Sequence, residues 1–145
     1  MSYYLFVVND VDYGNEILTA EEITHTLLAN KIWAYTKSTF HLKKFTRGDN
    51  VLLYCAGRKR RYFIAKFTIV GAIESNAIEP KGKNEEILKK TFPLQSKIDD
   101  VKIWSNPMPI KDIIEELDFI TDKKNWGLWF RKSVLALNKD AFDLI

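Results

Sequence analysis

The sequence predicts an α+β fold: a small mixed or antiparallel β-barrel of five to six strands with peripheral helices. Apolar runs that suit strands outnumber helical patterns, and turn residues separate them. With 145 residues, 46% of them hydrophobic, the chain is long enough for one well-buried core and too short for two comfortable domains. No repeat or Ser/Gly linker divides it. We therefore expect a single domain over residues 1–145.

The first half of the chain predicts a central strand, a helix and a long hairpin. Residues 3–8, YYLFVV, are apolar without polar alternation, which is typical of a central strand. The stretch TAEE at 19–22 fits a capping box and so predicts a helix after it. KIWAY at 31–35 indicates a second strand. Two further strands, VLLYCAG and RRYFIAKFTIVGAI, should form a hairpin that turns around residues 57–60.

The second half predicts a strand and up to three short helices. A short helix is expected within NEEILKK at 84–90. Residues 101–110 suit a strand that Pro107 and Pro109 should stop, because proline lacks the N–H that a central ladder needs. Apolar residues at 110, 113, 114 and 117 have the spacing of an amphipathic helix. Asn138 can cap a final helix.

The net charge of +3 is modest, but the basic residues are clustered. Between residues 37 and 61 there are eight basic residues and one acid, Asp49, whereas the rest of the chain has fourteen basic and eighteen acidic residues. The eight are Lys37, Lys43, Lys44, Arg47, Arg58, Lys59, Arg60 and Arg61. They form either a solvated surface turn or a patch that faces phosphates, since clustered Lys and Arg supply nucleic-acid affinity that is independent of sequence.

The sequence gives little support for metal, cofactor or membrane binding. His25, His41 and Cys55 are too few for a zinc site without carboxylate help. The scattered glycines match no phosphate-binding loop, so we expect no cofactor. No window approaches an eighteen-residue apolar run, and the N-terminus lacks the features of a signal peptide. A lone cysteine in an apolar run suits a reducing compartment, so we expect a cytoplasmic protein with a packed thiol at Cys55.

Several motifs, taken together and in order, resemble one known family. YYLFVVN, IWAYTK, FTRGDNVLLY, PIKDIIEELDFITDKKNWG and FRKSVLALNKDAFDLI resemble the EVE domains of the PUA-like superfamily, closest to small stand-alone archaeal and bacterial members. The resemblance implies a pseudo-barrel with a groove beside it, a scaffold that the related YTH and PUA domains use for nucleic acids. It also implies recognition of a modified base, chiefly modified cytosine in DNA.

The resemblance to the YTH pattern places two residues in a base pocket. Asn9 matches an asparagine that faces the base, and Trp33 matches the first tryptophan of the aromatic cage. A second cage tryptophan would lie between residues 74 and 94, where this chain has none. Phe92 or an aromatic residue from another element would have to take its place.

The residues themselves suggest further contacts around such a pocket. Tyr35 lies two residues after Trp33 and so shares its strand face, which makes it the second stacking candidate. Asn9 and Thr36 can bond a base edge or an exocyclic group. The candidates for phosphate contact are Lys37, Thr39, Lys43, Arg58, Arg60, Arg61 and Arg131. Trp104 and Trp126 are assigned to the core. No residue is assigned a catalytic role.

Two other functions remain open from the sequence. An RNA-binding module of the PUA kind has the same charge pattern, because only the 2′-hydroxyl distinguishes the two nucleic acids. The sister ASCH domains include proteins that resemble amidohydrolases for acylated nucleosides, and Thr36, Lys37 and Glu74 supply the residue types that they use. Adjacent residues on a strand point to opposite faces, which disfavours that alternative. A base reader would work with a nuclease or modifying enzyme on a separate polypeptide, and the modification it reads is left open.

Overall fold

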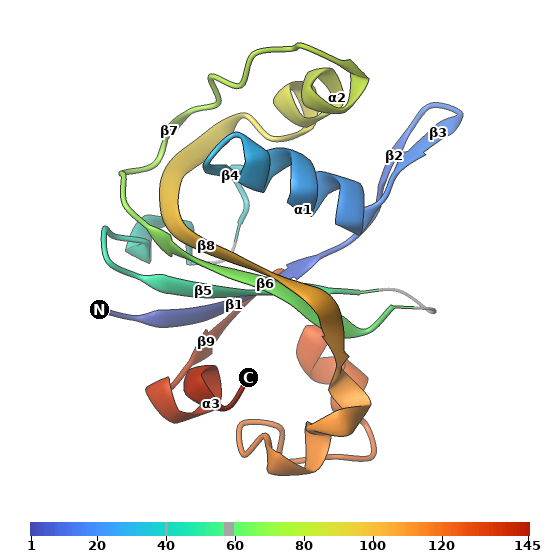
Figure 1. Cartoon of the computed structure of the whole chain (residues 1–145), viewed down its shortest axis with the longest axis vertical. Helices are drawn as coiled ribbons and strands as arrows, with labels where there is room; N and C mark the ends of the chain where they lie inside the picture. The colour runs from blue at the N-terminus through green and yellow to red at the C-terminus, as the bar shows by residue number, and fades with distance from the viewer. Residues whose placement is uncertain (40, 57–59) are drawn as a thin grey trace.

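The computed structural model of the protein describes residues 1–39, 41–56 and 60–145, and in this part of the chain one mixed sheet of seven strands curls into a half-barrel (Figure 1). Along the sheet the strand order is β4-β8-β6-β5-β1-β9, and the two-residue β7 pairs with the start of β8. The sheet strands are β1 Tyr3–Val8, β4 Ile32–Tyr35, β5 Asn50–Cys55, β6 Tyr62–Ile69, β7 Glu74–Ser75, β8 Leu94–Pro109 and β9 Val134–Leu137. The predicted α+β fold with a mixed, curled sheet and peripheral helices is confirmed, and the sheet of the described residues has seven strands where five to six were expected.

The strand β1 is central, as the unbroken apolar run predicts. It pairs with β5 in parallel, with Phe6 opposite Leu53, and with β9 in antiparallel orientation. The other pairings in the sheet, including the β5–β6 hairpin, are antiparallel. A separate hairpin, β2 Val11–Tyr13 with β3 Glu16–Leu18, projects beyond the end of β1 (Figure 1).

The expectation that prolines stop the strand that contains residues 101–110 is confirmed for Pro109 and wrong for Pro107. The strand β8 continues through Pro107 and ends only at Pro109. Over its last twelve residues β8 pairs with β6 on one side, while β4 and β7 pair with its first four residues. The prolines therefore lie on an edge of the sheet, where a missing N–H removes no ladder hydrogen bond.

Three α-helices form in the described part of the chain: α1 Ala20–Ala29, α2 Lys83–Thr91 and α3 Lys139–Leu144. Both predicted caps are confirmed. Thr19 Oγ1 accepts a hydrogen bond from the backbone N–H of Glu22 at 3.2 Å, and Asn138 Oδ1 accepts one from that of Ala141 at 2.7 Å. None of the helices in these described residues is long and apolar enough to cross a bilayer.

The amphipathic α-helix predicted from residue 110 is wrong. The segment forms two 3-10 turns, Ile110–Asp112 and Ile114–Glu116, separated by Ile113 at φ −129° and ψ 2°. The apolar residues of the pattern are nevertheless used, because Ile110 and Leu117 are fully buried against the sheet. Tertiary packing has overridden a local helical pattern. Two further 3-10 segments are Leu42–Lys44 and Trp126–Arg131.

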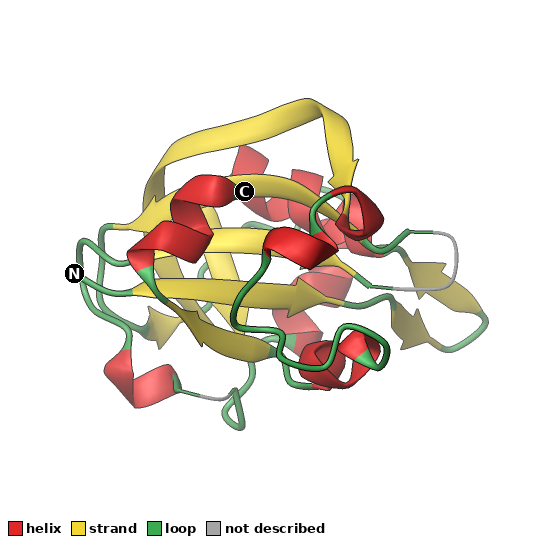
Figure 2. Ribbon diagram, turned by 90° about the horizontal axis from the view of Figure 1, so that it is seen from below, coloured by secondary structure: helices red, strands yellow, loops and turns green. Residues whose placement is uncertain are grey.

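The sheet has a hydrophobic core on each face. Side chains alternate along a strand, so Phe6 of β1 and Leu53 of β5 face the first core, while Val7 of β1 and Tyr54 of β5 face the second. The helices α1 and α2 cover the first core (Figure 1). The short helices of the C-terminal segment cover the second and lie across the strands in Figure 2. Burial on both faces explains why β1 shows no polar alternation.

Candidate functional site

A cavity of about 210 Å³ lies where the end of β1, the helix α1 and the strand β4 meet. All four predicted base-binding residues, Asn9, Trp33, Tyr35 and Thr36, line it, and so does Thr39. The other lining residues are Phe6, Val7, Val8, Asp10, Val11, Ile23, Leu27, Ala34, Phe92, Ser133 and Val134. The fold thus gathers residues from five separate parts of the sequence into one concavity, and the binding roles of the four predicted residues stay predictions.

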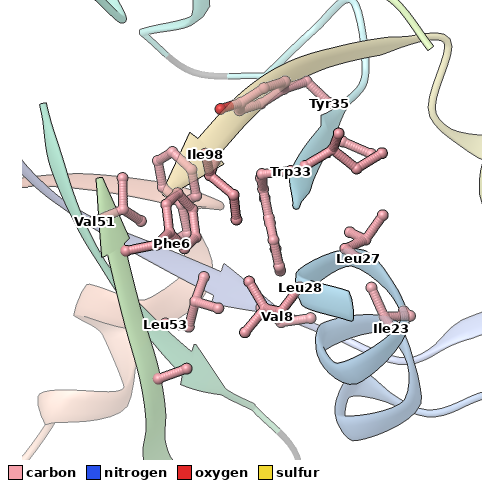
Figure 3. Close-up of a cluster of buried hydrophobic side chains, with 14 of the residues drawn as sticks. Phe6, Val8, Ile23, Leu27, Leu28, Trp33, Tyr35, Val51, Leu53 and Ile98 are labelled. Atoms are coloured by element: carbon pink, nitrogen blue, oxygen red, sulfur yellow. The ribbon is translucent and has the colours of Figure 1, made fainter. Parts of the chain in front are cut away.

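Trp33 forms part of the cavity wall and of the first core at once. Its side chain extends from β4 into the space between Phe6 on β1 and Leu27 on α1 (Figure 3). The indole is 7% exposed, and its centroid lies 5.7 Å from that of Phe67 and 6.3 Å from that of Phe6. Removing the ring would therefore open the core as well as the cavity.

Tyr35 is more firmly fixed in the core than Trp33. It is 2% exposed, and its hydroxyl shares a 2.8 Å hydrogen bond with Ser96 Oγ on β8. The ring packs against Phe45 at 5.5 Å and edge-on against Phe6 at 6.0 Å. Burial raises the pKa of Tyr35 well above its ordinary value, so the hydroxyl keeps its proton.

Asn9 and Phe92 supply the more accessible parts of the wall. Asn9 follows the last residue of β1 and is exposed at the rim, so its amide is accessible from the solvent side. Phe92 is half-buried at the C-terminal end of α2. The phenylalanine that the sequence offered as a substitute for the missing second tryptophan thus lies on the same cavity as Trp33.

A hydroxyl-rich turn forms another side of the rim. Thr39 Oγ1 accepts a hydrogen bond from the backbone N–H of Thr36 at 3.0 Å, and the two threonine hydroxyls are 3.1 Å apart. The backbone N–H of Thr39 closes the turn on the carbonyl of Thr36 at 3.2 Å. Side chains that bond their own turn in this way hold it in one conformation. Lys37, within the turn, is exposed.

Arg60 is bound to two carboxylates beside the cavity. Its Nη2 donates to Asp10 Oδ2 and its Nη1 to Glu21 Oε1, both at 2.6 Å. Tyr62 donates its hydroxyl to Glu21 Oε2 at 2.6 Å, and Asp10 Oδ1 accepts the backbone N–H of Ala20 at 2.8 Å. We call Asp10, Glu21, Arg60 and Tyr62 the rim clamp, because they join the segment after β1 to α1 and β6.

The positive charge of Arg60 in the rim clamp stabilises the negative charges of Asp10 and Glu21. The hydrogen bond from Arg60 is the main cause that holds the pKa of Asp10 below its ordinary value. At Glu21, burial pushes the pKa upward, but the hydrogen bonds from Tyr62 and Arg60 outweigh it and the net direction is downward. Both carboxylates are therefore charged at neutral pH, and Arg60, a predicted phosphate contact, already has two anionic partners.

The other predicted phosphate contacts are spread around the molecule. Lys37 and Lys43 are exposed on the segment that follows β4, and Arg131 is exposed at the end of the last 3-10 segment. Arg61 lies over the ring of Trp126, with its guanidinium carbon 5.6 Å from the centroid. Arg58 lies outside the described residues. The buried carboxylate of Asp49 accepts backbone N–H bonds from Ser2 and Thr46, both at 2.9 Å.

The residue types of the amidohydrolase alternative do not meet in the cavity. Thr36 lines it, but neither Lys37 nor Glu74 is among its lining residues. Glu74 lies on β7 and accepts a 2.8 Å hydrogen bond from Gln95 Nε2. Cys55 is fully buried, as predicted, and burial raises its pKa to about 12, which leaves the thiol protonated. Within the described residues no group of three His, Cys, Asp or Glu side chains could hold a metal.

Sequence reasoning missed the rim clamp and Ser133. Asp10, Glu21 and Arg60 are separated by up to fifty positions. No local spacing connects an acid that precedes the β2–β3 hairpin with an arginine that lies between β5 and β6. Ser133 joins the cavity because its carbonyl accepts the N–H of Val7 at 2.8 Å, just before β9 pairs with β1. Only the sheet topology reveals these neighbours.

The chain is similar to several known proteins. A UPF0310 protein of Mycolicibacterium gilvum (strain PYR-GCK) is 30% identical over 106 residues, which cover 72% of this chain and 71% of that protein. A UPF0310 protein of Mycobacterium avium (strain 104) is 30% identical over 108 residues, with 72% of each chain covered.

Solved structures share the fold. The human THYN1 protein, crystallised in complex with DNA that contains 5-methylcytosine, superposes with a TM-score of 0.63 at 13% identity and covers 99% of this chain and 95% of its own. The N-terminal domain of Staphylothermus marinus McrB gives a TM-score of 0.60 at 12% identity, with 99% and 92% covered. The profile of the EVE domain matches residues 2–145. The chain therefore belongs to the EVE domain family, as the motifs predict.

Proposed function

We propose that this protein is a non-catalytic, nucleic-acid-binding module that reads a modified nucleobase, with modified cytosine in DNA as the ligand. The observation that carries the proposal is the cavity in which Asn9, Trp33, Tyr35 and Thr36 meet. The same fold in THYN1, which binds DNA containing 5-methylcytosine, supports it. At about 210 Å³ the cavity is smaller than the roughly 300 Å³ at which pockets for drug-sized ligands begin, so it suits one base.

The chemistry of the cavity suits an extruded base. Taking a base out of a duplex costs a few kcal/mol, and each stack on an aromatic side chain returns about 1–3 kcal/mol. Trp33 and Phe92 are the aromatic walls against which the base lies. Asn9 supplies two donors and one acceptor for the base edge, and the hydroxyl of Thr36 contacts an exocyclic group.

Exposed basic residues outside the cavity hold the strand by its phosphates. Lys37, Lys43 and Thr39 lie on the segment after β4, and Arg131 is exposed just before β9. Their contribution is independent of sequence and falls with salt. Recognition of the modified base then depends on the cavity alone, and any nuclease or modifying enzyme acts as a separate partner.

The test measures binding to matched oligonucleotides with plain, methylated and hydroxymethylated cytosine, and with methylated adenine. Asn9→Ala is the variant of choice, because Asn9 is exposed and Trp33 is part of the core. Asn106→Ala, at an exposed position on β8, is the matched control. The proposal predicts a preference for one modified base that Asn9→Ala loses and Asn106→Ala keeps. Binding of the wild type that ignores modification would contradict it.

Two further measurements separate the alternatives. Competition between matched RNA and DNA oligonucleotides decides which nucleic acid is bound, because only RNA offers the 2′-hydroxyl. A time course with acetylated cytidine tests for amidohydrolase activity. Turnover that Thr36→Val abolishes would replace the reader with an enzyme.

A further inference from the structure

A second concavity lies on the opposite face of the sheet from the base cavity. This cleft has a volume of about 330 Å³ and is lined by Tyr54 of β5, Arg61 and a C-terminal group, with Ala56 and Gly127 between them. The C-terminal group is Lys124, Trp126 and Phe130. None of these described lining residues is acidic, and two are cationic.

Aromatic contacts fix the walls of the cleft. Tyr54 and Phe130 stack with centroids 4.4 Å apart and planes at 24°, and Trp126 meets Phe130 edge-on at 5.8 Å. Arg61 lies over the face of Trp126 at 5.6 Å, a cation–π arrangement that holds the guanidinium beside the cleft. The cation is thus placed by rigid aromatic groups of the second core.

The two cations of the cleft, Arg61 and Lys124, are not engaged in ion pairs with other described residues, whereas the neighbouring Arg60 has two. Tyr54 lines the cleft as well, so its hydroxyl is a third polar group beside the two cations. Burial raises the pKa of Tyr54 well above its ordinary value, so the hydroxyl keeps the proton that it would donate.

The cleft and the base cavity lie at the same end of the two central strands. The backbone N–H of Ala56, which lines the cleft, donates to the carbonyl of Val8, which lines the cavity, at 3.0 Å. Asn9 follows Val8 directly. A strand that places a base at Asn9 therefore runs close to the open side of the cleft, on the far face of β1 and β5.

We propose that the cleft is an anion site that binds a phosphodiester of the same nucleic-acid strand, with Arg61, Lys124 and the Tyr54 hydroxyl as its donors. Two cations and a hydroxyl around one small concavity suit a group with several acceptor oxygens, and charge-assisted hydrogen bonds of this kind are strong. The identity of the ligand rests on the proposed nucleic-acid function, whereas the anion site itself rests on the geometry of the cleft.

The test uses Arg61→Gln and Lys124→Ala, with Lys89→Ala as the matched control. Lys89 is an exposed lysine on α2. That helix lies on the other side of the sheet from the C-terminal segment that supplies Lys124 (Figure 1). Binding is measured to plain and modified duplexes at several salt concentrations. Each cleft variant should weaken binding severalfold, by the same factor for both duplexes, and lower the salt slope by about 1. Lys124→Arg keeps the charge, so its affinity and its salt slope should equal those of the wild type. Lys89→Ala should also match the wild type.

The outcome on the plain duplex separates this proposal from the reader hypothesis, because a reduced salt slope there requires no recognition of a modified base. Cleft variants that match Lys89→Ala on both duplexes would overturn the proposal. A second measurement identifies the source of the anion: inorganic phosphate is titrated at constant ionic strength into wild type and Lys124→Ala. If phosphate binding depends on Lys124 while DNA binding does not, the site serves a free phosphate and the nucleic-acid assignment is wrong.

Discussion

The base cavity and the cleft, at the end of β1 and β5, differ in whether their proposed binding residues also belong to a hydrophobic core. On one face, Trp33 and Tyr35 line the base cavity and also belong to the first core, where each contacts Phe6. On the other face, Arg61 and Lys124 lie at the edge of the second core, and buried neighbours such as Phe130 support the cleft from behind. The aromatic walls of the cavity, Trp33 and Tyr35, therefore cannot be removed without disturbing the fold, while the charges of the cleft can.

This difference decides how each face must be tested. A lost function after a change in the cavity wall is ambiguous, because a buried aromatic residue contributes to stability wherever it lies. A lost function after the removal of an exposed cation is informative, because surface substitutions usually change stability by less than about 0.5 kcal/mol. The following changes sharpen the comparison, from the largest expected effect to the smallest.

Trp33→Ala should cause the largest loss of stability. We expect a decrease of about 3–5 kcal/mol in the free energy of unfolding, since the change leaves a cavity between β1, β4 and α1. Urea denaturation followed by circular dichroism measures it. Trp126→Ala is the comparison on the other face, and it should cost less because Trp126 is half-buried. Equal losses would mean that the two faces do not differ as proposed.

Tyr35→Phe should lower stability by about 1–3 kcal/mol, because it leaves the buried Ser96 hydroxyl without its 2.8 Å partner. The double variant Tyr35→Phe with Ser96→Ala removes both partners and should recover much of the loss. Denaturation of the wild type and of these two variants provides the measurement. If Tyr35→Phe keeps full stability but loses the preference for a modified base, the hydroxyl acts in recognition and is not a core contact.

Arg60→Gln tests the rim clamp through its pH dependence. The depressed pKa of Asp10 means that the folded protein binds a proton there less readily than the unfolded chain does. The stabilisation is therefore present above the ordinary carboxyl pKa, near pH 4, and is lost as the pH falls through the lower folded value. Because the side chains of the clamp are partly exposed, we expect a loss of only about 1–2 kcal/mol at pH 7.

Denaturation of wild type and Arg60→Gln from pH 7 down to pH 3 measures this effect. The difference between the two proteins should shrink as the pH falls below about 4. A difference that stays constant over the whole range would show that Arg60 stabilises the fold by packing and not through its charge. The same variant also tests the earlier assignment of Arg60 to phosphate: an unchanged salt slope in DNA binding would assign it to the clamp.

The sequence predicted the central elements well, for identifiable reasons. The apolar run at residues 3–8 has no polar alternation because β1 is buried on both faces, and the period of two along β4 placed Trp33 and Tyr35 on one face. The caps at Thr19 and Asn138 depend on local chemistry and were found from it. The family resemblance supplied Asn9, whose position at the cavity no spacing within the sequence indicates.

The failures have a common physical cause. The segment from Ile110 has a helical pattern, but the same apolar residues pack against the second core from two 3-10 turns. The course of β8 through Pro107 depends on that part of the strand being an edge, which is a property of the sheet order. Arg60 and Arg61 were both predicted to contact phosphate. In the structure Arg60 has two carboxylate partners, whereas Arg61 lies over the ring of Trp126. Each of these outcomes is decided by contacts between distant segments.

Lys124→Ala should have the smallest effect on stability, within about 0.5 kcal/mol of the wild type, because Lys124 is exposed and takes part in none of the ion pairs among the described residues. Urea denaturation next to Lys89→Ala, which makes the same change on α2, measures it. A charge kept on a concave surface without contributing to the fold is available for a ligand. A loss above about 1 kcal/mol, well outside the usual range for surface changes, would instead make Lys124 a structural residue, and the cleft would lose one of its two cations as evidence for an anion site.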